Sequence, residues 1–288
     1  MSGIRIVITG ARGQLATDLL RVLEGFDVVP LSHQQLDICD QAAVDDLFSS
    51  SCPDVLMNTA AFHRVDDCEE QPELAFRVNA YGVSNLARAC GKTGCVLVHM
   101  STDYVFDGKK GQPYLEEDPP RPINMYGVSK LAGELVIRYM MSRYFIVRSS
   151  GLYGQAGASG KSGNFVNTML RLAKEGRPIR VVDDQCLSPT YTLDLASKIA
   201  WLITTNNFGT YHITNTEYCS WFGFARAIFD EARVDVKVAP TTTEAFGAKA
   251  ERPPFSTLGH GALRALGADD MRPWREALRS YLQEIGAV

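Results

Sequence analysis

The sequence predicts an α/β protein in which a parallel sheet is covered by helices on both faces. Short apolar runs rich in β-branched residues alternate with helical periodicity over the first 150 residues. Near-continuous apolar strands separated by helices are typical of a parallel sheet buried on both sides. The expected strands are residues 4–9, 27–31, 54–58, 95–100 and 144–148, and the expected helices are 14–24, 41–50, 72–91 and 125–141.

The turn after the first strand has the pattern of a dinucleotide-binding site. The run IRIVIT leads directly into a G-x-x-G-x-x-A motif formed by Gly10, Gly13 and Ala16, and a helical pattern of leucines follows. Gly10 permits the tight turn, Gly13 lets the backbone approach a pyrophosphate, and Ala16 lets the helix pack closely on the strand. The helix N-terminus then attracts phosphate. An ordinary strand-to-helix turn remains the alternative for this motif taken alone.

A second group of residues has proton-transfer chemistry. Tyr126 and Lys130 form a Y-x-x-x-K pair in NMYGVSK, and Thr102 lies 24 residues before Tyr126 at the end of an apolar run. Residues i and i+4 share a helix face, and a nearby ammonium lowers the pKa of a phenol from its ordinary ~10. The three side chains can therefore move a proton to or from a carbonyl or alcohol. A solvated helix face explains the Y-x-x-x-K pair alone, but not its combination with the glycine turn.

Ligands of doubly wound sheets bind outside the C-terminal ends of the strands. The expected strand ends carry most of the candidate residues, namely Gly10, Ser32 and His33, Thr59 to Ala61, Thr102, and Ser149 and Ser150. The sequence therefore places the site at one edge of the sheet.

The chain divides into two unequal lobes. We expect residues 1–150 to form an NAD(P)-binding domain of the doubly wound, Rossmann-like type, with about 183–206 returning to it. Residues 151–182 and 207–288 are expected to form a smaller α/β substrate-binding lobe. In the second part of the chain we expect helices at 164–175, 192–204, 220–232 and 273–285, and a short strand at 211–214.

A Gly/Ser-rich segment, GQAGASGKSG at 154–163, predicts a mobile loop that closes over a substrate. It ends in GKS, but Gln155 stands where a phosphate-binding P-loop requires glycine. The P-loop interpretation is therefore rejected.

Composition excludes several functional classes. A net charge of −4 provides no basic field for nucleic acid, and no apolar stretch is long enough to span a bilayer. The first residues lack a signal-peptide pattern. The seven cysteines include no C-x-x-C pair, which indicates reduced thiols in a cytoplasmic protein.

Four long strings carry a family resemblance. They are PDVLMNTAAFHRVDDCEEQPELAFRVNAYG (53–82), STDYVFDGKKGQPYLEEDPPRPINMYGVSKLAGE (101–134), GNFVNTMLRLA (163–173) and VVDDQCLSPTYTLDLA (181–196). The chain resembles the extended short-chain dehydrogenase/reductases, and among them most closely the dTDP-4-dehydrorhamnose reductase family. The resemblance implies NAD(P)H-dependent reduction of the 4-keto group of a dTDP-linked 6-deoxyhexose, giving dTDP-L-rhamnose for polysaccharide biosynthesis. A homodimer is a further expectation.

The resemblance also implies roles for individual residues. Tyr126 matches the catalytic acid, Lys130 its partner at the nicotinamide ribose, and Thr102 the hydroxyl that orients the keto oxygen. The residues that match cofactor contacts are Gly10, Gly13, Gln14 and Leu15 at the pyrophosphate, Asp37 and Ile38 at the adenine, and Thr59, Ala60 and Ala61 at the nicotinamide half. The residues that match substrate contacts are Val65, Tyr104, Asn164 and Phe165.

The chain departs from the family pattern at two places. Gly151 stands where the family often has a tryptophan that stacks on the sugar, so the identity of the sugar stays open. Asp18 matches one acidic residue that holds a metal at a dimer contact in some members, but Leu193 stands where a second acid is needed. We therefore expect no required metal.

Cofactor choice follows from the end of the second strand. No acidic residue directly follows this strand to bind a ribose 2′-hydroxyl, whereas Arg12, Ser32 and His33 can accept a 2′-phosphate. We therefore predict NADPH, with NADH tolerated. Two alternatives remain at this point: a nucleotide-sugar epimerase or another 4-ketoreductase, and a non-catalytic protein similar to the regulatory subunit of methionine adenosyltransferase.

Overall fold

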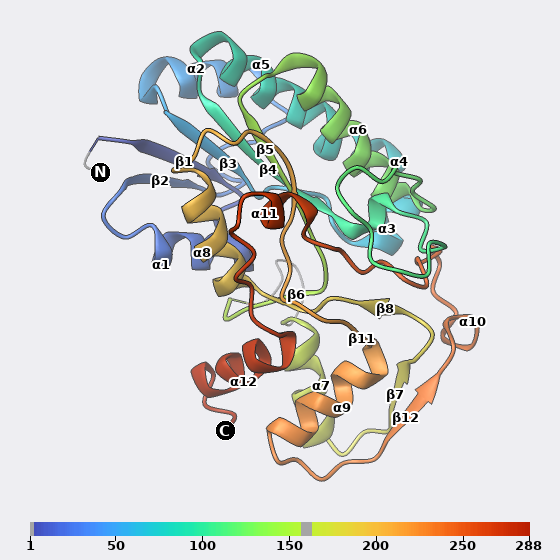
Figure 1. The fold of residues 1–288 in the computed structure, drawn as a ribbon. Helices are drawn as coiled ribbons and strands as arrows, with labels where there is room; N and C mark the ends of the chain where they lie inside the picture. The colour runs from blue at the N-terminus through green and yellow to red at the C-terminus, as the bar shows by residue number, and fades with distance from the viewer. Residues whose placement is uncertain (1–2, 157–162) are drawn as a thin grey trace.

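A computed structural model describes residues 3–156 and 163–288, and its centre is a six-stranded sheet (Figure 1). All neighbouring strands are parallel, in the order β10-β5-β4-β3-β1-β2. Their bounds are β1 Arg5–Thr9, β2 Asp27–Leu31, β3 Val55–Asn58, β4 Val96–Thr102, β5 Tyr144–Ser149 and β10 Gly209–His212. The five predicted strands and the α/β class are confirmed. The strand order reverses between β1 and β3, which is where such sheets open a ligand crevice.

Side chains alternate along each strand and so divide the core into two layers. In β1, Ile6 and Ile8 pack with α1 (Gln14–Val22) and α8 (Thr192–Leu202), whereas Val7 packs on the opposite face. That opposite face is covered by α2 (Gln41–Ser51), α5 (Val83–Thr93) and α6 (Met125–Met140) (Figure 1). Because both faces are buried, the strands have the near-continuous apolar sequences that predicted them.

The predicted helix at 72–91 is interrupted. It consists of α4 (Pro72–Phe76), a π-helical turn (Arg77–Gly82) and then α5. The buried Asn79 sits in this turn, where its Oδ1 accepts from the Phe62 amide and its Nδ2 donates to the Phe62 carbonyl, both at 2.9 Å. The turn thus fixes the segment after β3, which is followed by a short helix, α3 (Val65–Glu70). Single π-turns of this kind often occur at functional sites.

The second lobe has its own aromatic core. Helices α7 (Phe165–Lys174), α9 (Trp221–Glu231) and α12 (Trp274–Glu284) pack together around aromatic side chains that include Phe224, Tyr153 and Tyr281. Small strand pairs extend this lobe: β7 (Ile179–Val182) with β12 (Val238–Thr241), β6 (Leu152–Tyr153) with β9 (Thr190–Tyr191), and β8 (Cys186–Leu187) with β11 (Cys219–Ser220). The short helices α10 (Thr243–Phe246) and α11 (Gly261–Ala265), and a 3₁₀ turn after β4 (Asp103–Val105), complete the described elements.

The predicted division put residues 207–288 in the second lobe, whereas the structure places β10 in the main sheet. This strand pairs with β5 as an edge of the main sheet, and Leu263 of α11 packs in the same core layer as α8. A strand of only four residues, GTYH, can extend either lobe, so its sequence did not decide between them. We propose a two-lobe division in which 209–214 and 261–271 join the first lobe. Among the described residues, no helix combines the length and the apolar character needed to cross a membrane.

A buried ion pair fixes α6 on the sheet. Glu134 Oε2 accepts from Arg148 Nη2 at 2.6 Å, and its Oε1 accepts from Arg148 Nε at 2.9 Å and from Ser101 Oγ at 2.6 Å. The side chains of Glu134 and Arg148 are both fully buried. The pair therefore ties α6 to the C-terminal halves of β4 and β5.

We expect Glu134→Gln to lower the free energy of unfolding by about 3–5 kcal/mol, because it leaves the Arg148 charge buried without its counter-charge. Urea denaturation measures the change. The matched control is Glu175→Gln, which removes a carboxylate from an exposed pair with Arg171 and should leave the midpoint unchanged. Equal midpoints for both variants and the unmodified protein would show that the buried pair does not anchor the helix.

Candidate functional site

A cleft of about 1180 Å³ follows the C-terminal edge of the sheet and continues toward the second lobe. Its lining confirms that the predicted residues converge, although their roles remain predictions. The predicted residues that line it are Gly10, Arg12, Gly13, Gln14, Leu15, Ser32, His33, Asp37, Ile38, Thr59, Ala60, Ala61, Thr102, Tyr126, Lys130, Asn164 and Phe165. Val65, the first residue of α3, and Tyr104 do not line the cleft.

The glycine turn brings the backbone close to the cleft. Gly10 has a φ of +73°, and a Cβ there would lie 2.8 Å from the Ala60 nitrogen. Gly13 is the N-cap of α1 and has no side chain with which to cap it, so the first N–H groups of the helix stay available to a ligand. Gln14 Oε1 and Ser149 Oγ are buried without a hydrogen-bond partner among the described residues. These features fit a bound dinucleotide whose pyrophosphate lies at the helix N-terminus.

The chain after β2 is ordered by its own side chains. The amide and the hydroxyl of Ser32 both donate to Gln35 Oε1, at 2.9 and 2.7 Å, and Asp37 Oδ1 accepts from the Cys39 amide at 2.9 Å. Ile38 packs directly against Gly82, since a Cβ added at Gly82 would lie 2.7 Å from Ile38 Cγ1. Ser32 therefore already has a partner for its hydroxyl proton, while His33 is exposed at the rim.

Tyr126 lies in the first turn of α6, directly over the turn that follows Thr102. The N-cap of α6 is Asn124, whose Oδ1 accepts from the Gly127 amide at 2.8 Å. A Cβ at Gly127 would lie 2.1 Å from the Tyr104 carbonyl oxygen, so only glycine allows this approach. The rings of Tyr104 and Tyr126 meet edge to face at 5.9 Å.

Burial raises the pKa of Tyr126, while a hydrogen bond with Thr102 opposes the rise. The phenol therefore stays protonated at neutral pH. A protonated phenol is the form that can donate to a developing alkoxide.

Lys130 does not reach the phenol as predicted. Its ammonium nitrogen donates to the Met100 carbonyl at 2.6 Å and lies 3.3 Å from His99 Nε2. Burial lowers the pKa of Lys130 to about 8, with Glu134 opposing. The prediction that Lys130 lowers the pKa of Tyr126 is wrong for this structure, because the lysine is satisfied by strand β4 and burial dominates the phenol.

Asp103 is a buried residue that sequence reasoning missed. Its carboxylate accepts from Thr102 Oγ1 at 3.0 Å, from Ser150 Oγ at 2.9 Å and from Ser256 Oγ at 2.5 Å. Burial raises its pKa to about 6, and these hydrogen bonds oppose the rise. Its position next to Thr102 in STDYVF was the available signal. No sequence pattern indicated the contact with Ser256, which lies 153 positions away.

The second lobe contributes Asn164 and Phe165 at the N-terminus of α7. Asn164 Nδ2 donates to the Gly154 carbonyl at 2.8 Å and to Tyr281 Oη at 2.9 Å, while its Oδ1 caps the Asn167 amide at 3.0 Å. Its side chain is thus largely structural. Phe165 packs on Trp221 at 4.6 Å, and Trp221, which was not predicted, also lines the cleft. Most of the predicted loop at 154–163, residues 157–162, lies outside the described residues.

The backbone at residue 151 favours glycine, where the resemblance led us to expect a tryptophan. Its φ is +57°, and a Cβ there would lie 2.6 Å from Leu187 Cδ1. A side chain at this position would therefore collide with Leu187, so bare backbone lines this part of the cleft.

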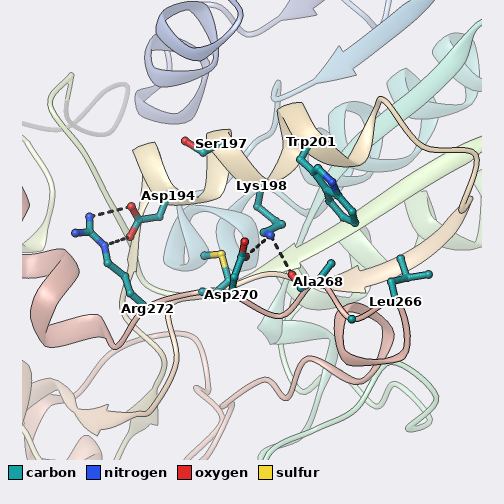
Figure 2. Close-up of a pocket in the computed structure, with 10 residues that line it drawn as sticks. Asp194, Ser197, Lys198, Trp201, Leu266, Ala268, Asp270 and Arg272 are labelled. Atoms are coloured by element: carbon teal, nitrogen blue, oxygen red, sulfur yellow. Dashed lines mark hydrogen bonds and ion pairs between the residues drawn. The ribbon is translucent and has the colours of Figure 1, made fainter.

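A smaller pocket of about 550 Å³ lies between α8 and residues 266–272 (Figure 2). Its charges are paired within it: Asp194 accepts from Arg272 at 2.8 and 2.9 Å, and Lys198 contacts Asp270 and donates to the Ala268 carbonyl at 3.0 Å. None of the predicted catalytic or cofactor residues lines this pocket. These pairs join α8 to the C-terminal segment, so we assign the pocket a structural role.

The carboxylate of Asp18, which the resemblance matched to a metal-holding acid, accepts hydrogen bonds inside the protein. It is fully buried, and its oxygens accept from Thr192 Oγ1 at 2.5 Å and from Arg21 Nη1 at 2.8 Å. Within residues 3–156 and 163–288, no group of three or more His, Cys, Asp or Glu side chains is arranged to hold a metal ion.

Comparison with known proteins identifies the family. A family model described as "RmlD substrate binding domain" matches residues 4–287. The chain belongs to this family. It is 43% identical to the spore coat polysaccharide biosynthesis protein SpsK of Bacillus subtilis, with 97% of each chain covered. It is 40% identical to a dTDP-4-dehydrorhamnose reductase of Streptomyces griseus, over 95% of this chain and 91% of the relative.

A solved structure of a family relative has the same fold. It is a dTDP-4-dehydrorhamnose reductase from Bacillus anthracis in complex with NADP, 43% identical to this chain. The two superpose with a TM-score of 0.94 over 98% of this chain and 99% of the other.

We expect Gly10→Ala to weaken dinucleotide binding at least ~10-fold, a loss of about 1.4 kcal/mol, because the new Cβ meets the Ala60 backbone where the chain must approach the ligand. Isothermal titration with NADP⁺ gives the affinity. Gly25→Ala is the control, since Gly25 also has a positive φ, of +99°, but has open space around it. Equal losses of affinity in both variants would point to general strain rather than a nucleotide cradle.

Proposed function

We propose that this protein is an NADPH-dependent oxidoreductase that reduces the 4-keto group of a dTDP-linked 6-deoxyhexose, converting dTDP-4-dehydrorhamnose to dTDP-L-rhamnose for polysaccharide biosynthesis. The observation that carries the proposal is the placement of Tyr126 beside Thr102 in the cleft that also holds the glycine turn. Family membership, reductase relatives and a neighbour solved with NADP support it.

The cofactor supplies the hydride. Tyr126 then neutralises the negative charge that develops on the keto oxygen by giving up its phenolic proton. The raised pKa of Tyr126 keeps that proton in place until the oxygen becomes basic. The Thr102 hydroxyl donates to Asp103 in this structure, and we propose that it turns toward the same oxygen when the substrate binds.

Cofactor binding is assigned to three parts of the cleft. The glycine turn and Gln14 would hold the pyrophosphate, and Thr59 to Ala61 would border the nicotinamide half. Arg12, Ser32 and His33 would surround the ribose 2′-phosphate, because no acidic residue directly follows β2. Lys130 would bind the nicotinamide ribose.

The substrate would occupy the remaining part of the cleft. Tyr104 and Val65 do not line the cleft in this structure. We propose that they reach the sugar when it binds, because Tyr104 lies beside Tyr126 and Val65 begins the helix that follows the nicotinamide segment. Phe165 and Asn164 would lie near the nucleotide diphosphate.

We also infer a cytoplasmic location, supported by seven cysteines that are all free thiols. A homodimer is supported by exposed apolar side chains along α6 and the π-turn before α5. These are Tyr81, Val128, Leu135 and Tyr139.

Tyr126→Phe removes the proposed acid but keeps the ring, so we expect kcat to fall ~10²–10⁴-fold. NADPH oxidation with dTDP-4-keto-6-deoxyhexose generated in situ measures it, and the affinity for NADPH should not change. The control is Tyr218→Phe, since Tyr218 is 51% exposed and does not line the cleft. Full turnover by Tyr126→Phe would mean that another group donates the proton.

Arg12→Ala should reduce kcat/KM for NADPH at least ~10-fold, because a charge-assisted contact to the 2′-phosphate is lost. The value for NADH should stay the same. An equal loss with both cofactors would remove Arg12 from the 2′-phosphate site.

A further inference from the structure

A line of hydrogen bonds joins the turn after β3 to Lys130 through the interior of the sheet. Asn58 Oδ1 accepts from the Ala60 amide at 3.1 Å and from Thr9 Oγ1 at 2.7 Å. Asn58 Nδ2 lies 3.0 Å from His99 Nδ1, and His99 Nε2 lies 3.3 Å from Lys130 Nζ. Asn58, His99 and Lys130 are each at most 2% exposed, so water does not replace these contacts.

The backbone sets the orientation of the Asn58 amide. The Ala60 N–H can only donate, so the Asn58 oxygen faces it and the NH₂ group faces His99 Nδ1. His99 Nδ1 is therefore an acceptor. Burial lowers the pKa of His99 far below its ordinary value, so the ring is neutral. A neutral imidazole carries one N–H, and in His99 it must be on Nε2, facing Lys130.

This tautomer disfavours a charged lysine. An ammonium has three donors and no acceptor, whereas an uncharged amine has a lone pair that can accept the His99 Nε2–H. The same nitrogen still donates to the Met100 carbonyl at 2.6 Å.

Two other ionisable side chains are relevant to the pKa of Lys130. The Glu134 carboxylate raises the pKa of Lys130 but is shared with Arg148 and Ser101, and Tyr126 on the same helix is a neutral phenol. Burial prevails over Glu134 and brings the pKa of Lys130 to about 8.

We propose that His99 is a positioning residue that holds Lys130 against β4 and favours its uncharged form, and that Lys130 takes up a proton from solvent when it leaves this position to bind the ribose hydroxyls of the cofactor. The inference rests on the proposed function, since that function gives Lys130 its ligand. Because Ala60 borders the cleft, the tautomer of His99 is set from the nicotinamide segment itself.

The tautomer can be observed directly in the full-length protein. Nitrogen-15 NMR of labelled histidines, with His99→Gln to assign the signals, should show His99 neutral and protonated on Nε2 from pH 6 to 9. Addition of NADP⁺ should shift the Nε2 signal as Lys130 moves away. A ring protonated on Nδ1, or on both nitrogens, would overturn the proposal.

Proton uptake gives a second readout that does not require turnover. Titration of NADP⁺ near pH 8 in buffers of different ionisation enthalpy should reveal net uptake of protons by the wild-type protein, and less uptake by Lys130→Met. Binding without any proton uptake in the wild type would contradict the proposal.

Asn58→Asp reverses the tautomer without changing the shape of the side chain. Its carboxylate still accepts from the Ala60 amide and also accepts a hydrogen bond from His99 Nδ1–H, so the lone pair of Nε2 faces Lys130 and favours the ammonium. In the wild type, kcat/KM for NADPH should fall as pH rises through about 8, where Lys130 loses its proton. In Asn58→Asp this decline should move up by about one pH unit or more, a tenfold change in proton concentration.

Asn79→Asp is the matched control, because Asn79 is also buried and bonds to Ser129 on α6 but not to His99. It should move the decline less than Asn58→Asp does. Equal shifts of the decline in the two variants would show that added negative charge alone causes the effect, and would overturn the proposed role of His99. If no keto-sugar is turned over, the proposed function fails, while the NMR and proton-uptake measurements still decide the role of His99.

Discussion

The site depends on the close approach of α6 to the end of β4. Gly127 allows the first turn of α6 to lie against the carbonyl of Tyr104, and the buried Glu134–Arg148 pair fixes the same helix two turns later. Because the helix is held at these two points, Tyr126 and Lys130 have little freedom to shift along the sheet. The distance from the phenol to Thr102 is therefore a property of the fold and not of one flexible side chain.

The sheet was largely predictable because its strands are buried on both faces and follow one another closely in the sequence. Ile6, Val7 and Ile8 of β1 show an apolar run that serves both core layers. The π-turn was not predictable, since it arises from a contact between Asn79 and Phe62 that no helical periodicity records. The position of β10 was also missed, because pairing at a sheet edge depends on its neighbour, β5, and not on its own four residues.

The composition of the cleft was predictable for a different reason. Parallel strands bring their C-terminal ends to one edge, so residues such as Gly10, Thr59 and Thr102 had to converge. The direction of a long side chain is decided by what it meets locally, and Lys130 meets the Met100 carbonyl and His99. Trp221 joins the site through packing between distant parts of the chain, which spacing alone does not reveal, whereas the position of Asp103 directly after Thr102 could have indicated it.

The bare peptide at Gly151 has a chemical consequence for the hexose. An aromatic floor would offer a broad π surface to the C–H bonds on one side of a pyranose, whereas main-chain amides offer directional dipoles. The positive φ at residue 151 disfavours any side chain there, and Leu187 would also have to shift to admit one. With the proposed sugar bound over this backbone, selection among deoxysugars would rest on where hydroxyl groups find donors and acceptors, and less on which face of the ring is flat.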